Sequence, residues 1–252
     1  MPHHIYRYIS FETFVGMVQK QSLTFVLPKV WDDPKERTAV FSFVEKIDNI
    51  HRRMMYLALQ GKTYAQCWTK QDESDALWRI YAYGNRSIRI KTSREKIVQL
   101  EDVYAFDVKY VDDLDCISED ADFFDAFTRK RKAFEHEKEV RLINSYKFKS
   151  DADCEKHIKA LMVVSQKNGR IDVLNNLYPD MPVEKQVQSV IELLNIGENS
   201  QVSKEISFAH IDNFIEGVMV HPLAPKWYVE IVKEFCNRNN LVFEGQSDLY
   251  LK

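Results

Sequence analysis

The chain has 252 residues, a formal net charge of -3, 45% hydrophobic residues and 29% charged residues. This composition is that of an ordinary globular protein, and it gives no overall basic field that would favour nucleic-acid binding. No apolar run approaches the ~20 residues of a membrane span, and the few glycines form no dinucleotide-binding or phosphate-binding loop.

The cysteines and the N-terminus give the expected compartment. Four cysteines (Cys67, Cys116, Cys154 and Cys236) show neither CxxC spacing nor the Cys/His spacing of a metal site. This pattern argues against a zinc site and a disulfide framework, and it suits a reducing cytoplasm. The N-terminus also lacks the apolar region of a signal peptide. We therefore expect a cytoplasmic protein with no membrane contact and no metal.

The first half of the chain alternates short strands and helices. Ser10 and Ser74 are suited to cap the helices that follow them, and Pro34 is suited to open one after the turn at Trp31. Gly84 is suited to end a helix. The predicted strands are His4–Ile9, Ser22–Leu27, Tyr64–Thr69, Arg86–Thr92 and Val103–Val111, and the predicted helices are Phe11–Gln21, Phe43–Gln60, Asp75–Ala82 and Ser93–Leu100.

The second half contains a long amphipathic segment, Phe123–Glu137, which we predict as a helix. Its basic run, Arg129–Lys132, is either a solvated face or a contact to phosphate or RNA. The other predicted helices are Asp151–Val164, Val183–Leu194 and Pro225–Arg238, and the predicted strands are Glu139–Tyr146, Ile215–His221, Leu241–Glu244 and Asp248–Leu251. The fold class is α+β: a single domain over residues 1–252, with a mixed central sheet flanked by helices and a helical insertion near 151–203.

The segment around Glu139 carries the strongest chemical signal. In an extended strand alternate residues share a face, so Glu137, Glu139 and Arg141 should lie on one face, with Val140 and Leu142 buried on the other. Two acids and a guanidinium on one face form either a self-satisfied ion network or the floor of a site.

Other candidate residues each have a structural interpretation. Trp78 and Tyr81 lie three apart and share one helical face, which suits core packing or ring stacking. The acidic loop of Asp32, Asp33 and Glu36 suits a turn that leads into a helix N-terminus. Two isolated histidines, His210 and His221, are read as structural.

Several short motifs occur in a fixed order along the chain. They are YRY, LTF, WDDPKE, CWT, LWRIYAYG, EKEVR and GVMVHPLA. In this order the chain resembles the bacterial domain-of-unknown-function family 2971, which includes AbiGi-like abortive-infection proteins. The usual N-D-P-x-E loop has Asp32 in place of Asn here, and Cys67-Trp68-Thr69 replaces an S-F-S-like segment. The resemblance spans Ile5 to Leu251.

That family is distantly similar to ADP-ribosyltransferases, including the toxin branch that modifies DNA. The resemblance implies an ADP-ribosyltransferase-like fold with NAD as co-substrate. The first-strand position that contacts NAD falls at Arg7 or Tyr8, although many ADP-ribosyltransferases have His there. The aromatic residue that stacks on nicotinamide falls at Trp78 or Tyr81, and the catalytic glutamate falls at Glu139.

Further roles follow from this resemblance. Glu137 would orient Glu139 or act as the base toward the acceptor, and Arg141 would complete the NAD site beside them. Arg7 would bind the pyrophosphate as a bidentate fork, or it is a plain surface arginine. A carboxylate beside the ribose would stabilise the oxocarbenium ion that forms when nicotinamide leaves.

Two functions remain open. The first is an anti-phage defence or toxin-type effector that uses NAD to modify a protein or nucleic acid, or that simply consumes NAD. The second is a non-catalytic antitoxin or sensor that binds a protein or nucleic-acid partner through the same cleft. A nuclease is the weakest reading, because the acids form no recognisable metal set. The enzyme requires Glu139 in a concave pocket together with Arg7 or Tyr8 and Trp78 or Tyr81.

Overall fold

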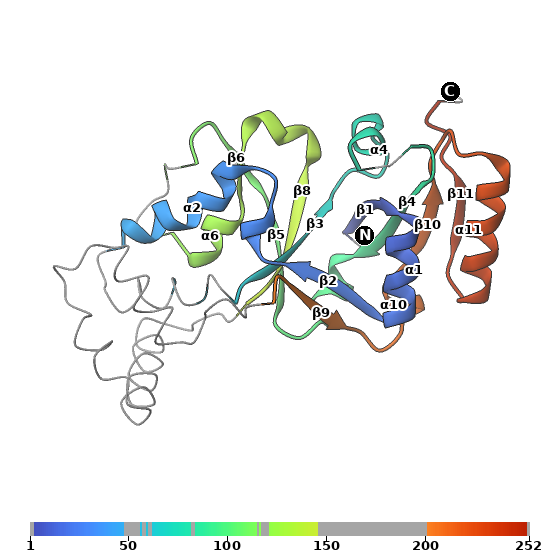
Figure 1. Ribbon diagram of the computed structural model, residues 1–252, viewed down its shortest axis with the longest axis horizontal. Coiled ribbons are helices and arrows are strands. Elements are labelled where there is room, and N and C mark those ends of the chain that lie inside the picture. Colours follow the sequence, from blue (N-terminus) through green and yellow to red (C-terminus); the bar gives the residue numbers. More distant parts are fainter. Residues whose placement is uncertain are drawn as a thin grey trace.

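The structure is a computed structural model that describes residues 3–47, 56, 59, 62–81, 84–114, 116, 121–145 and 201–250. In these residues nine strands form one sheet, and helices lie against it (Figure 1). The strands of this sheet are β1 (His4–Ser10), β2 (Ser22–Val26), β3 (Tyr64–Thr69), β4 (Ser87–Ser93), β5 (Val103–Asp107), β8 (Glu139–Asn144), β9 (Ser203–Ser207), β10 (Gly217–Val220) and β11 (Phe243–Gln246).

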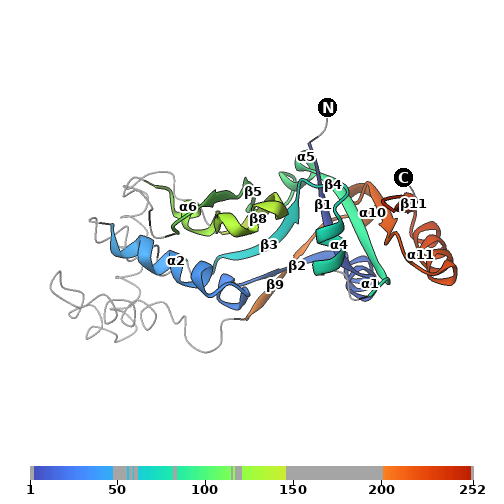
Figure 2. The same ribbon diagram turned by 90° about the horizontal axis from the view of Figure 1, so that it is seen from above.

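A second, two-stranded sheet pairs β6 (Lys109–Val111) with β7 (Arg129–Arg131) in parallel. The helical elements are α1 (Phe11–Lys20), η1 (Pro28–Val30), α2 (Pro34–Glu45), α4 (Asp75–Tyr81), α5 (Arg94–Ile97), α6 (Phe123–Phe127), η2 (Lys132–Glu137), α10 (Ile211–Phe214) and α11 (Lys226–Arg238). Figure 2 shows α2 and α6 at one end of the large sheet and α1 and α11 at the other.

The large sheet is mostly antiparallel, and only β10 with β11 runs parallel. Together with the flanking helices, this confirms the mixed central sheet that the sequence predicts. Among the described residues, no helix combines the length and apolar character that crossing a membrane requires.

The large sheet divides at β3. Along one edge β3 pairs with β8 through six residue pairs. On its other edge β1 pairs only at Thr69, and β2 pairs only at Ala65. β1 and β2 therefore separate from one another beside the middle of β3, where Cys67 lies. This division creates the opening in which the candidate site lies.

Local sequence signals explain several element boundaries. Ser10 caps α1, because its hydroxyl accepts a hydrogen bond from the Thr13 amide at 3.2 Å. Asp33 caps α2 by accepting from the Lys35 amide at 3.0 Å, and Pro34 takes the first helical position. The helix containing Phe43 thus begins at Pro34, earlier than predicted, and the described part of it ends at Glu45.

The predicted helix over Phe123–Glu137 is wrong. The segment forms the short helix α6, then β7, then the 3-10 helix η2. The Thr128 hydroxyl bonds back to the Phe124 carbonyl at 2.9 Å, and the next residues pair with β6 instead of continuing the helix. Three residues of the basic run, Arg129–Arg131, consequently form a strand. Lys130 points into a cluster of carboxylates, whereas Arg131 and Lys132 are exposed.

Three smaller predictions also differ from the structure. Val103–Val111 forms two strands, β5 and β6, because the extended segment is interrupted at Val108 and β6 pairs with β7. Asp248–Tyr250 forms no strand. β9 was not predicted, because its exposed residues show little apolar alternation, and it is held by pairing with β2. The predicted helices Asp151–Val164 and Val183–Leu194 lie outside the described residues.

The main core lies under β8 and its neighbours. As predicted, Val140 and Leu142 are fully buried, and they join a cluster that includes Ile5, Phe14 and Trp68. Because side chains alternate along β8, Glu139 and Arg141 must point to the opposite face. That face carries the candidate site.

Candidate functional site

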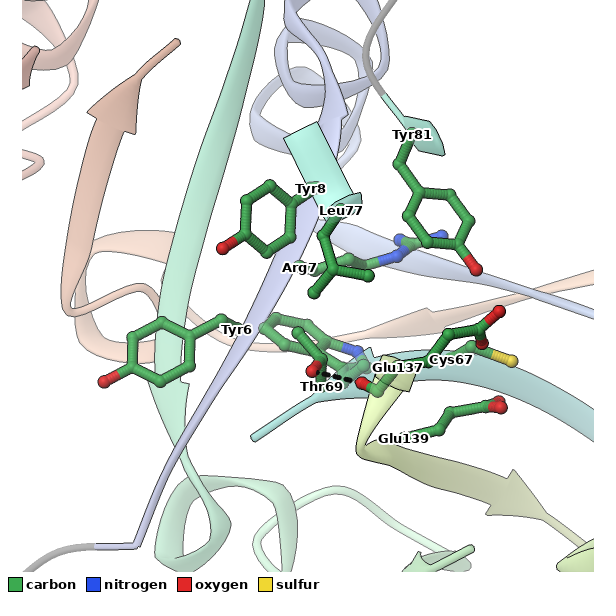
Figure 3. A pocket seen from close by; sticks show the side chains of 10 residues that line it. Tyr6, Arg7, Tyr8, Cys67, Thr69, Leu77, Tyr81, Glu137 and Glu139 are labelled. Atoms are coloured by element: carbon green, nitrogen blue, oxygen red, sulfur yellow. Dashed lines mark hydrogen bonds between the residues drawn. The ribbon is translucent and has the colours of Figure 1, made fainter. Parts of the chain in front are cut away.

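Two cavities meet at the division of the sheet and form one groove. The inner cavity has a volume of about 140 Å³, and β1, β3, α4 and the start of β8 line it (Figure 3). The outer cavity has a volume of about 520 Å³ and extends toward η1, α2 and η2. Both cavities are lined by Cys67, Tyr81, Glu137 and Glu139. The two glutamates therefore lie where the inner and outer parts of the groove join.

A left-handed turn at Lys138 brings both glutamates to the groove. Lys138 has φ 44° and ψ 48°, so the chain changes direction between the end of η2 and the start of β8. The Thr69 hydroxyl donates to the Glu137 carbonyl at 2.6 Å, and the Glu139 amide donates to the Tyr110 hydroxyl at 2.7 Å. These bonds fix the backbone on both sides of the turn.

We expect Lys138→Gly to stabilise the fold by about 0.5–1 kcal/mol, because glycine adopts this left-handed conformation without the steric cost that a side chain meets. Urea denaturation of the purified variant measures the change. Lys138→Ala is the matched control, since it also removes the ammonium but keeps the steric cost. If the Ala variant were as stable as the Gly variant, the turn would carry no strain.

Glu139 is the most buried acid of the groove, with only 3% of its surface exposed. Arg141 donates to its two carboxylate oxygens at 2.8 and 3.2 Å, and Lys130 donates at 3.2 Å. Burial by itself raises the pKa of Glu139, but Arg141 and Lys130 outweigh it and lower that pKa to about 2. Glu139 is therefore ionised at every physiological pH.

Arg141 connects Glu139 to the acidic loop. Its guanidinium also donates to the Glu36 carboxylate and, at 2.7 Å, to the Phe127 carbonyl. The Trp31 ring stacks on the guanidinium, with 4.1 Å between the ring centroid and the Arg141 Cζ atom. Although burial opposes the charge, the Glu139 and Glu36 carboxylates raise the pKa of Arg141. Arg141 is thus a fixed cation that holds two acids from distant parts of the chain.

Lys130 is the second cation of this cluster. Its ammonium lies 2.6 Å from Glu137, 3.2 Å from Glu139 and 3.9 Å from Glu36. Three carboxylates thus face two cations, which leaves one negative charge at the junction of the groove. Burial and the Glu139 charge raise the pKa of Glu36, and Arg141 and Lys130 only partly offset them. The predicted ion network is therefore present, and its residues line the groove.

Arg7 lies in the inner cavity on β1, the strand that leaves β3 at the division of the sheet. Its guanidinium makes no hydrogen bond and no ion pair with another described residue. Removal from water lowers the pKa of Arg7 to about 10, so the side chain stays charged at neutral pH. Within the described part of the chain, Arg7 is thus a half-buried cation that lines a cavity and has no anionic partner, which suits it to bind an anion.

The predicted aromatic residues fall into two groups. Tyr8 and Tyr81 line the inner cavity, and Figure 3 shows the Tyr81 hydroxyl directed toward the glutamates. Tyr81 is 45% exposed and also lines the outer cavity. Trp78 is fully buried and lines neither cavity; its ring packs against Tyr8 at 4.7 Å and against His221 at 5.2 Å.

Sequence reasoning missed three residues of the groove as site candidates. Cys67 is exposed and lies opposite Arg141 in the ladder of β3 and β8. Glu36 and Lys130 complete the charged floor. Glu36 was visible in the acidic loop and Lys130 in the basic run, but no local pattern indicates that they meet. Within the described residues, no group of three or more His, Cys, Asp and Glu side chains is arranged to hold a metal ion.

Of the seven residues proposed from the sequence, six line the groove and Trp78 does not: Arg7 and Tyr8 in the inner part, Arg141 in the outer part, and Tyr81, Glu137 and Glu139 in both. The identity of the ligand must be inferred from these residues themselves. No protein-family model, no curated protein and no solved structure matches this chain.

Proposed function

We propose that the protein is an effector of anti-phage defence or of a toxin system, with an ADP-ribosyltransferase-like core that uses NAD to modify a macromolecule or consumes NAD. One observation supports this proposal most strongly: the same small cavity is lined by Arg7 and Glu139. Arg7 has no anionic partner among the described residues, and Glu139 is ionised. The resemblance of the motif order supports the defence role. Among the described cysteines no disulfide forms, which fits action in the cytoplasm.

The charges of the groove complement those of NAD. Its pyrophosphate is anionic and suits the Arg7 guanidinium, which can donate two parallel hydrogen bonds. Its nicotinamide ring is cationic and suits the inner cavity, which is lined by the ionised Glu139 carboxylate but not by Lys130. Tyr8, Leu77 and Tyr81 provide apolar walls for a flat ring.

Glu139 then acts on the ribose. Breaking the bond between the ribose C1′ and the nicotinamide nitrogen leaves positive charge on the ribose, and the Glu139 carboxylate stabilises that charge. The bonds from Arg141 and Lys130 hold the carboxylate in place and keep it ionised. Glu137, at the junction, lies where it can accept the proton of the acceptor.

We expect Arg7→Met to weaken NAD binding about 10- to 100-fold, because one charge-assisted contact contributes about 1.5–3 kcal/mol. Isothermal titration of NAD into the wild type and the variant measures this. Arg79→Met is the control, since Arg79 is an exposed arginine that pairs with Asp75 on α4. Equal affinity of the Arg7 variant and the wild type would show that Arg7 binds no part of NAD.

A specific observation also favours the alternative, a non-catalytic antitoxin or sensor. The Glu139 charge is already offset by Arg141 and Lys130 without any ligand, which suits a structural role as well as catalysis. In that case the affinity for NAD or a partner would depend on Arg7, but the protein would release no nicotinamide from NAD. Measuring binding and nicotinamide release on the same preparation separates the two functions.

A further inference from the structure

Lys130 has an unusual place for a residue in a run of four basic side chains. Its side chain is 12% exposed, and its ammonium lies among Glu36, Glu137 and Glu139 at the floor of the groove. By contrast, Lys132 of the same run is mostly exposed and lies 3.8 Å from Asp112 on the surface. The charge of Lys130 is therefore directed at the carboxylates beside the proposed reaction centre.

The position of Lys130 is fixed by the chain around it. β7 pairs with β6 on both sides of Lys130, and the Phe134 ring lies 4.8 Å from its ammonium. Lys130 is also the cation that pairs with the Glu137 carboxylate among the described residues, whereas Glu139 has Arg141 in addition. The space next to Glu137 is thus already occupied by a positive group that belongs to the protein.

We propose that Lys130 is a specificity-determining residue, which occupies the place where a cationic acceptor would bind and restricts transfer of ADP-ribose to neutral acceptors. This inference rests on the proposed function. A guanidinium or ammonium group that approached Glu137 through the outer cavity would meet the Lys130 ammonium at close range. The Lys130 side chain is only 12% exposed, so water screens this repulsion less than it would at the surface. A hydroxyl group or a water molecule meets no such repulsion.

With a neutral acceptor, the reaction breaks one bond at C1′, forms one bond at C1′ and releases one proton. The bond between C1′ and the nicotinamide nitrogen breaks, and nicotinamide leaves as a neutral molecule with the electron pair. The acceptor oxygen forms a new bond to C1′, and its proton passes to Glu137 and then to solvent. With water as acceptor the product is free ADP-ribose, and with a hydroxyl group it is an O-linked ADP-ribose.

A melting experiment tests whether the place of Lys130 is a cation site, independently of NAD. Lys130→Ala removes the aminoalkyl chain, so added propylammonium should fill the space and raise Tm by about 2–4 °C. The wild type and the surface control Lys132→Ala should show no such rise. If the Ala variant melts too early to measure, Lys130→Ser is used, with ethylammonium as the added cation. No specific rise in either variant would overturn the assignment.

An acceptor experiment tests specificity. Wild type, Lys130→Ala and Lys130→Arg are incubated with NAD and agmatine, a small guanidino compound, and the ADP-ribosylated product is measured. Because Lys130 also holds Glu139, the overall rate is set aside, and the ratio of ADP-ribosylated agmatine to nicotinamide released is compared. We expect this ratio to be at least about tenfold larger with Lys130→Ala than with the wild type, and unchanged with Lys130→Arg, which keeps the charge. The same ratio for all three proteins would overturn the inference. Absence of nicotinamide release by the wild type would instead overturn the proposed function.

Discussion

Glu139→Gln is expected to lower the rate of nicotinamide release about 10²–10³-fold, the usual loss when one preorganised electrostatic contact to a transition state is removed. Glutamine keeps the shape of the side chain, but it lacks the negative charge that the oxocarbenium ion requires. The charge is normally present at all physiological pH values, because the pKa of Glu139 is held at about 2 by Arg141 and Lys130. Release of nicotinamide from NAD, followed by chromatography, measures the effect.

The same variant should remain folded. Without the Glu139 charge, Arg141 still pairs with Glu36 and Lys130 still pairs with Glu137, so two carboxylates face two cations. We expect a loss of about 2–3 kcal/mol, less than the total stability of an ordinary domain. Glu135→Gln is the control, since Glu135 is exposed and its ion pair among the described residues is a surface pair with Lys138. Full activity of folded Glu139→Gln would exclude the transferase mechanism.

Arg141→Met should have the largest effect on stability, a loss of about 3–5 kcal/mol. Arg141 is 1% exposed, and its removal leaves Glu36, Glu137 and Glu139 around the single ammonium of Lys130. Denaturant unfolding measures the loss. Arg238→Met, which removes an exposed arginine paired with Glu234 on α11, should cost at most about 1 kcal/mol. Equal losses of unfolding free energy in Arg141→Met and Arg238→Met would show that the cluster contributes little to the stability of the fold.

The dependence of the unfolding free energy on pH provides a second test of the same ion-pair cluster. Because the pKa of Glu139 is depressed to about 2 in the folded state, its contribution is fully present above the ordinary pKa of about 4.5. Stability is then lost as the pH falls from about 4.5 toward 2, by about 3 kcal/mol for this group. In Arg141→Met the loss over this interval should shrink, since burial without Arg141 raises the pKa of Glu139.

The sequence predicted those parts of the fold that local patterns determine. The alternation of Glu139, Val140, Arg141 and Leu142 correctly placed the core face and the charged face of β8. Ser10 and Pro34 correctly marked the beginnings of helices, because capping depends on residues within one turn. The placement of Arg7 beside Glu139 came from the family resemblance, since no local pattern connects β1 with β8.

The rest depends on contacts between distant segments. Periodicity alone favours a helix over Phe123–Glu137, and the pairing of β7 with β6 overrides it. The same strand turns Lys130 toward Glu36, a residue that lies far away in the sequence. The division of the sheet at β3 likewise follows from the single contacts that β1 and β2 make there. These features exist only once the chain has folded.

The proposed NAD site is tested most directly by a crystal structure of the protein with an NAD analogue in which the bond to nicotinamide cannot be cleaved. We expect the nicotinamide ribose within hydrogen-bonding distance of the Glu139 carboxylate and the pyrophosphate on the Arg7 guanidinium, with Tyr81 against the ring. The groove found empty at saturating analogue, or the analogue bound with its pyrophosphate away from Arg7 and its ribose away from Glu139, would contradict the proposed site.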